Sequence, residues 1–148
     1  MELNPAQQLM ARRYHCSEAV LMAVCKEMGI ESPLIPRIAT AFAGGMGRSG
    51  EVCGAVTGAI MCIGIKHGRE EPGQWQADDI ANGLTQRFLR AFRDEMGAIQ
   101  CRELTGFDLS TPEGLQAFRA SDVLVNVCLR AVGFAYERTL ELLAPIQQ

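Results

Sequence analysis

The chain has 148 residues, of which 48% are hydrophobic and 21% are charged. This length and balance fit one folded domain with one hydrophobic core, and they exclude a disordered chain. The net charge of −3 argues against a nucleic-acid or anionic-membrane surface. We recognise no targeting segment, and the longest uncharged apolar run, 52–65, is too short to span a bilayer. We therefore expect a cytoplasmic protein without membrane insertion.

Helix signals follow one another along the chain. The expected helices span about 4–29, 32–42, 50–66, 76–96 and 122–143, with a short helix beginning near 111. Typical caps support them, such as Thr111 before Pro112 at one start and Gly97 at one end. The stretch 12–15 could interrupt the first helix, which the pattern leaves open. No run alternates with a period of two, so the sequence predicts an all-α, single-domain bundle of four main helices plus short ones over residues 1–148.

A glycine-rich loop covers residues 44–50, and its spacing Gly45-x-Gly47-x-x-Gly50 matches a dinucleotide-binding loop. Such a loop needs a β-strand before it and a helix after it. The segment before it, 33–44, instead has two prolines and a helical pattern. We therefore expect no nucleotide here, and we interpret the glycines as residues that allow sharp turns and close helix packing.

Six cysteines without a secretory signal point to buried hydrophobes, metal ligands or redox-active thiols, because a reducing cytosol disfavours structural disulfides. Cys53 falls in the first turn of its expected helix, where unpaired backbone N–H groups stabilise a thiolate. Arg48 lies just before it and could add positive charge. We predict that Cys53 is the most reactive thiol, with a pKa below the ordinary value. Cys16 is placed similarly if the first helix breaks before it.

The positions of the cysteines divide them into two groups. Cys25 and Cys62 each follow another cysteine, Cys16 and Cys53, by nine residues. At about 100° per residue, nine residues place two side chains on opposite faces of one helix. We therefore interpret Cys25 and Cys62 as core packing. The remaining cysteines can meet only through folding, and we expect them to converge: Cys16, Cys53, Cys101 and Cys128.

The ordered motif resembles the C_GCAxxG_C_C family of small helical redox-active proteins from bacteria and archaea. The matching stretches are "YHCSEAV" around Cys16, Cys53-Gly54-Ala55-x-x-Gly58, "CRELTG" at Cys101, and Cys128 in the last helical stretch. The resemblance covers nearly the whole chain. It implies redox or metal chemistry at the four cysteines, with Cys53 and Cys16 as redox thiols. A related domain occurs in split-Soret-type cytochromes, where its cysteines look like the ligands of an iron–sulfur or iron site.

Two kinds of site remain open at this point. Four thiolates suit an iron–sulfur cluster, an iron ion or a zinc ion, whereas a dithiol site needs only two sulfurs within disulfide geometry. The Cys-x-x-Cys pair usual in both is missing. We expect a redox-active protein that uses dithiol/disulfide chemistry or an iron–sulfur or iron centre for electron transfer. The alternatives are a non-enzymatic zinc- or iron-binding protein and a structural helical module. A redox partner is implied but not identified, and self-association stays open.

Overall fold

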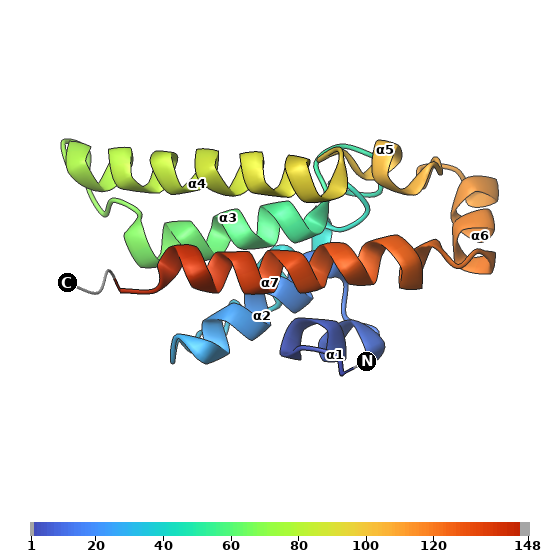
Figure 1. Ribbon diagram of the computed structural model, residues 1–148, viewed down its shortest axis with the longest axis horizontal. Coiled ribbons are helices and arrows are strands. Elements are labelled where there is room, and N and C mark those ends of the chain that lie inside the picture. The colour runs from blue at the N-terminus through green and yellow to red at the C-terminus, as the bar shows by residue number, and fades with distance from the viewer. Residues whose placement is uncertain (1, 146–148) are drawn as a thin grey trace.

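A computed structural model describes residues 2–145 of the chain and shows an elongated helical bundle (Figure 1). The helices are α1 (Pro5–Ala11), α2 (Cys16–Glu27), the 3₁₀ helix η1 (Arg37–Phe42), α3 (Gly54–His67), α4 (Trp75–Met96), α5 (Cys101–Thr105), α6 (Pro112–Ala120), the π-helical turn η2 (Leu124–Cys128) and α7 (Leu129–Leu143). No β-strand occurs within the described residues, where β pairing is limited to one isolated bridge. The all-α prediction with four main helices, α2, α3, α4 and α7, is confirmed.

Helix α3 forms the centre of the bundle. It packs against α2, α4 and α7, and Figure 1 shows it between α4 and α7 with α2 and α1 on the remaining side. Its sequence explains this position, because most of its residues are small or apolar and its first six, Gly54–Ala59, are all buried. A helix that is apolar on all sides is stable only when other helices cover it. Any residue at the N-terminal end of α3 is thereby fixed in the interior.

The first expected helix is divided in two. Arg13 adopts a positive φ of 74°, and α2 begins anew at Cys16 with His15 as its N-cap. In α1, Asn4 and Gln7 form a capping box, and both side chains also donate to backbone carbonyls of α7. The break places Cys16 in the first turn of a helix, which the sequence pattern alone left undecided.

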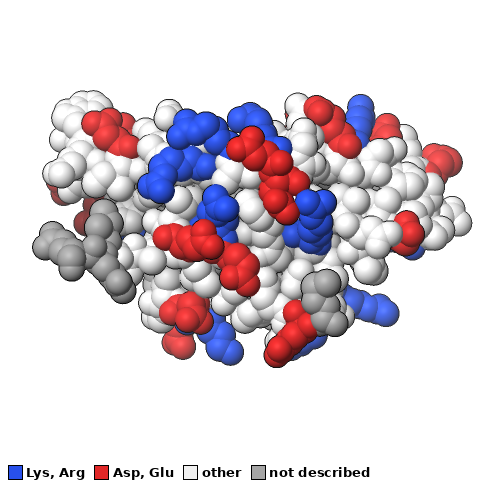
Figure 2. All heavy atoms as spheres, viewed as in Figure 1, with Lys and Arg blue, Asp and Glu red and all other residues white. Residues whose placement is uncertain are grey.

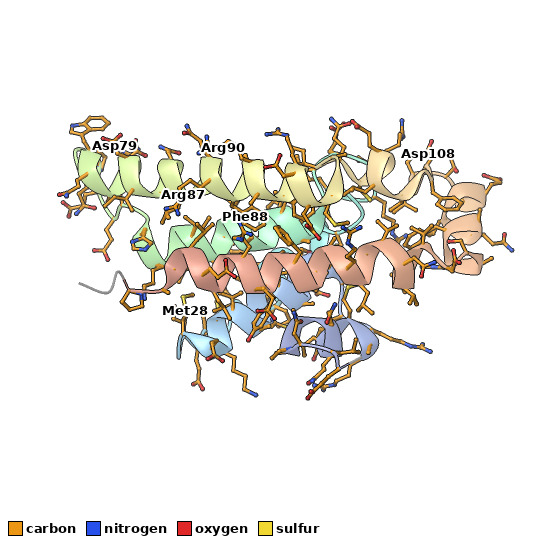
Figure 3. All side chains as sticks on the ribbon, in the orientation of Figure 1. Met28, Asp79, Arg87, Phe88, Arg90 and Asp108 are labelled. Carbon is orange, nitrogen blue, oxygen red and sulfur yellow. The ribbon has the colours of Figure 1, made fainter. Side chains whose placement is uncertain are left out.

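Helices α4 and α7 bury an aromatic cluster. Phe88 and Phe92 on α4 are fully buried, and the ring of Phe92 meets that of Phe134 edge-on with centroids 6.0 Å apart. In Figure 3, Phe88 lies on the inner side of α4 while Arg90 points outward. Gly97, with a φ of 86°, ends α4, as predicted. The chain then turns back at this end of the bundle through α5 and α6.

The surface carries mixed charge. Figure 2 shows Lys and Arg side chains interleaved with Asp and Glu over the face in view. Long helices are present, but within residues 2–145 none combines the length and the apolar character needed to cross a bilayer.

Helices α2 and α3 approach each other at glycines. A Cβ atom at Gly58 would lie 2.8 Å from the carbonyl oxygen of Ser17 and 3.2 Å from the Cβ of Val20. Backbone oxygen atoms cannot move aside as a flexible side chain can, so a larger residue at this position would push the two helices apart. Gly64, two turns later in the same helix, has no heavy atom within 4 Å of the corresponding position.

The two glycines provide a matched test of this packing. We expect Gly58→Ala to destabilise the protein by about 1–3 kcal/mol through overpacking. Gly64→Ala should stabilise it by about 0.5–1 kcal/mol, because alanine favours the helical conformation and meets no neighbour. Urea unfolding of both variants, followed by circular dichroism, measures the difference. Equal effects of the two substitutions would contradict the close approach of α2 and α3.

Candidate functional site: a four-cysteine cavity

Four cysteines from different segments line one small cavity of about 30 Å³. The remaining lining residues are Gly54, Leu104, Thr105, Val127 and Ala131. Cys16 begins α2, Cys53 caps α3, Cys101 begins α5 and Cys128 ends η2. The structure thus brings together the four cysteines selected from the sequence, whereas Cys25 and Cys62 lie outside this cavity. Cys16 and Cys128 are partly exposed, and the other two are buried.

The start of α2 is held in place by hydrogen bonds on both sides of Cys16. The Glu18 carboxylate accepts the backbone N–H of His15 at 2.9 Å and the hydroxyl of Thr40 at 2.7 Å. The Ser17 hydroxyl, which is fully buried, donates to the carbonyl of Ala39 at 2.7 Å. These contacts anchor the first turn of α2 to η1, so the direction of the Cys16 side chain is set by buried polar groups.

An isolated β-bridge positions the second and third cysteines. Val52 pairs with Gln100 in antiparallel orientation. The backbone N–H of Cys53 donates to the carbonyl of Ile99, and that of Cys101 donates to the carbonyl of Glu51, both at 2.7 Å. Each cysteine therefore lies at the point where a short bridging segment enters a helix, and the bridge keeps the two side by side.

The glycine-rich loop is a tight left-handed turn. Five consecutive residues, 44–48, have positive φ values between 60° and 71°, including Met46 and Arg48. A residue with a Cβ in this region costs about 1–2 kcal/mol, so the loop is strained. Its backbone bonds include Glu51 N–H to the carbonyl of Gly45 at 2.9 Å. Helix η1, and not a β-strand, precedes the loop, as expected; the absence of nucleotide binding stays a prediction.

Gly54 explains why glycine follows the motif cysteine. A Cβ atom at this position would overlap the sulfur of Cys16 and would lie 3.0 Å from the backbone nitrogen of Ser17. The Cys16 sulfur therefore lies directly against the backbone at the start of α3. Two helix N-termini, those of α2 and α3, meet at this atom.

The surroundings of Cys16 stabilise its thiolate. The Cys53 thiol lies within hydrogen-bonding reach and is the largest influence, and the backbone N–H groups of Gly44, Ser17 and Gly54 also reach the sulfur. Burial opposes them, but together these donors lower the pKa of Cys16 to about 7. At neutral pH about half of this thiol is ionised, which is the property that a nucleophilic cysteine needs.

The expectation that Cys53 has a lowered pKa is wrong. The hydrogen bond to Cys16 holds the proton on Cys53, and burial and the nearby Cys16 charge act in the same direction, so its pKa rises well above the ordinary value. The error came from placing Cys53 inside the first helical turn. It is the N-cap residue, and although the backbone N–H of Ala55 lowers its pKa, the hydrogen bond with Cys16 and burial outweigh that donor.

The other two cysteines of the cavity keep their protons at neutral pH. Burial, followed by the Cys16 charge, raises the pKa of Cys101 to about 11, against a hydrogen bond from Thr105. Burial and the charges of Cys16 and Cys101 raise the pKa of Cys128 to about 12. Thr105 was not predicted as a site residue, although its spacing of four residues from Cys101 places both on one helix face. The backbone N–H donors of Gly44 and Gly54 could not be found from the sequence, because glycine has no side chain that would indicate such a role.

The arginines near the motif act elsewhere. Arg102 forms an ion pair with Asp108 at 3.1 Å, in which both side chains are about half exposed, and not with Glu103. Arg48 is exposed on the glycine-rich loop. His15 is exposed as well and serves as the N-cap of α2. The acidity of Cys16 therefore comes from thiol and backbone donors, and none of these three side chains is among its causes.

Cys128 ends a π-helical turn. Helical structure runs without a break from 123 to 143, close to the predicted 122–143, but its first part, η2, is π-helical and Cys128 is the last residue of that turn. Single π-turns inside helices are frequent at functional sites, because the extra residue redirects the neighbouring side chains. Gln7 of α1 donates to the carbonyl of Leu129 at 3.1 Å and so fixes this segment from the other side.

The four thiols do not form a ready metal site. Within residues 2–145, no group of three or more His, Cys, Asp or Glu side chains is arranged so that it could hold a metal ion. The donor set is chemically suited to iron or zinc, but the cavity that the four cysteines share is only about 30 Å³, and Cys16 is hydrogen-bonded to Cys53.

Comparison with known proteins agrees with the motif. A family model described as "Putative redox-active protein (C_GCAxxG_C_C)" matches residues 14–142. The chain belongs to this family. The matched range contains all four cysteines of the cavity and spans α2 to α7. No match was found among curated proteins or among solved structures.

We predict that alkylation separates the four thiols by pH. For metal-free, reduced protein, the rate at Cys16 should rise about tenfold per pH unit below pH 7 and level off above it, because only the thiolate reacts. Cys101 and Cys128 should react at least about 50-fold more slowly at pH 7, because their small fraction of thiolate outweighs the higher intrinsic nucleophilicity of a high-pKa thiolate. Iodoacetamide labelling, quantified at each site by mass spectrometry, measures these rates. Faster labelling of Cys53 than of Cys16 at pH 7 would contradict this assignment.

A pair of loop glycines tests how Cys101 is positioned. Gly45 and Gly47 both have positive φ, but a Cβ at Gly45 would lie 2.5 Å and 2.7 Å from the backbone nitrogen and oxygen of Glu51, whose carbonyl accepts the Cys101 N–H, and 2.8 Å from the Cβ of Cys101, whereas one at Gly47 meets nothing within 4 Å. We expect Gly45→Ala to cost about 1–3 kcal/mol more than Gly47→Ala and to increase labelling of Cys101. The backbone strain is common to both variants, so the difference measures the clash. Thermal unfolding and labelling that do not distinguish the variants would disprove the contact.

Proposed function

We propose that the protein carries out reversible dithiol/disulfide exchange through Cys16 and Cys53. The observation that carries the proposal is the contact between these two thiols, one with a lowered pKa and partly exposed, the other protonated and buried. Family membership adds that the chain is one of a group described as redox-active. The substrate class that this pair suits is a disulfide of a partner protein or a small molecule.

The exchange proceeds in two displacements. The Cys16 thiolate attacks one sulfur of the substrate disulfide, which forms a mixed disulfide and releases the other substrate sulfur as a thiolate. That thiolate, or water, takes the proton of Cys53, and the Cys53 sulfur then attacks Cys16. The second substrate sulfur leaves as a thiolate and is protonated by solvent. Two electrons pass from the protein to the substrate, and a Cys16–Cys53 disulfide remains.

The different environments of the two thiols suit these roles. The attacking thiol must be ionised and reachable, and of the two residues Cys16 has the lowered pKa and is the less buried. The resolving thiol must stay protonated until the mixed disulfide forms, and the raised pKa of Cys53 follows from the same hydrogen bond. When Cys16 has reacted, its negative charge is lost, so the main cause of that raised pKa disappears and Cys53 becomes easier to ionise.

A metal centre is the second candidate. The convergence of Cys16, Cys53, Cys101 and Cys128 on one cavity favours it, because four thiolates are the ligand set of iron–sulfur clusters and of structural zinc sites. These residues would hold the metal, which would supply one-electron transfer as an iron centre or a structural role as zinc. The present spacing of the side chains speaks against this candidate.

Anaerobic purification followed by redox titration decides between the two. We expect protein with no stoichiometric iron or zinc, which forms a Cys16–Cys53 disulfide in a glutathione redox buffer. Peptide fragmentation by mass spectrometry locates the bond. Cys16→Ser and Cys53→Ser should each abolish it, whereas the matched controls Cys101→Ser and Cys128→Ser should retain it. Stoichiometric iron with visible charge-transfer bands, lost in all four variants, would overturn the proposal in favour of a metal centre.

A further inference from the structure

A second pair of thiols lies between the same two helices. Cys25 on α2 and Cys62 on α3 are within hydrogen-bonding reach of each other, and their exposed fractions are 1% and 0%. The nine-residue spacing predicts that both lie in the core, which their burial confirms, but it does not indicate that they meet. Neither residue lines the four-cysteine cavity.

The two thiol pairs lie at different levels along helices α2 and α3. Helices α2 and α3 both begin at the four-cysteine end and run in the same general direction (Figure 1). Cys25 follows Cys16, and Cys62 follows Cys53, by nine residues, which at 1.5 Å per residue is about 13.5 Å along a helix axis. Sulfur atoms that far apart cannot exchange directly, so any oxidation of the second pair needs its own route of access.

A surface groove comes close to this pair. A groove of about 550 Å³ runs between α1, the second half of α2 and the turn that follows, and Cys25 is among its lining residues. Leu9, Met22 and Ile30 form part of its walls. Because Cys25 is almost completely covered, a bulky disulfide cannot reach its sulfur from the groove. A small, uncharged oxidant can approach far more easily.

We propose that Cys25 and Cys62 form a second redox dithiol, which a small peroxide oxidises through this groove. The Cys25 sulfur attacks one peroxide oxygen, so that an S–O bond forms, the O–O bond breaks, and a sulfenic acid and water result. The Cys62 sulfur then attacks the Cys25 sulfur, the S–O bond breaks, and a second water leaves with the Cys62 proton. The two thiols lose two electrons in total, and one hydrogen peroxide becomes two waters.

The electrostatics of the pair agree with these roles. The hydrogen bond from Cys62 lowers the pKa of Cys25, while the same bond and burial raise the pKa of Cys62. The residue nearer the groove is therefore the better nucleophile. The resulting disulfide would link α2 to α3 beyond Gly58, the residue at which α3 packs closely against α2.

Two double variants separate this site from the four-cysteine cavity. Each removes one thiol from each helix: C16S/C53S keeps only the second pair between α2 and α3, and C25S/C62S keeps only the first. Trypsin releases peptides 14–26 and 49–66, which carry these positions. After equimolar hydrogen peroxide and an acid quench, we expect native C16S/C53S to show the two peptides disulfide-linked. The link should form at least tenfold faster than in the same variant unfolded in urea.

The control outcomes are distinct. A link that forms no faster in native than in unfolded C16S/C53S would overturn the second site, while a link in C25S/C62S reports only on the first. If circular dichroism shows that C16S/C53S does not fold, fragmentation of the linked peptides from unmodified protein locates the bond instead. There, the absence of a Cys25–Cys62 bond would equally overturn the proposal.

Gln8→Trp, at an exposed position lining the groove, should slow oxidation of Cys25 several-fold; an unchanged rate would contradict entry through the groove.

Discussion

The contact between the Cys16 sulfur and the backbone at Gly54 is the constraint on which the site depends. It requires the first turns of α2 and α3 to touch, which only a residue without a Cβ permits. The same approach continues at Gly58 and brings the later thiols Cys25 and Cys62 together. One close helix pair therefore determines the position of both sulfur pairs, and α4 and α7 complete the bundle around it.

The neighbouring segments serve to keep this contact in one geometry. The break at Arg13 starts α2 at the cavity, and the strained loop 44–48 returns the chain so that the Gly44 N–H faces the same sulfur. Strain of this kind persists only where surrounding structure enforces it, and it concentrates at functional sites. Here the burial of α3 and the Val52–Gln100 bridge provide that enforcement.

The four main helices and the four cysteines that line one cavity could be predicted from the sequence, because helical periods and an ordered motif are local signals. The sequence does not indicate the break before Cys16, because Arg13 takes a positive φ at a place where neither glycine nor proline marks a turn. It assigned the acidic thiol to Cys53 and not to Cys16, because the deciding donors come from other segments of the chain. The nine-residue spacing removed Cys25 and Cys62 from the first site but contained no information on which helices face each other.

The source of the acidity of Cys16 has a consequence for how the site responds to its surroundings. Its stabilising partners are a thiol and main-chain N–H groups in direct contact with the sulfur, and no charged side chain is among them. Mobile ions screen charges that interact through solvent over distances of about 10 Å at 0.1 M ionic strength, but not donors in contact. The ionisation of Cys16 is therefore insensitive to salt concentration. Substitutions of surface charges around the cavity should therefore leave the pKa of Cys16 unchanged.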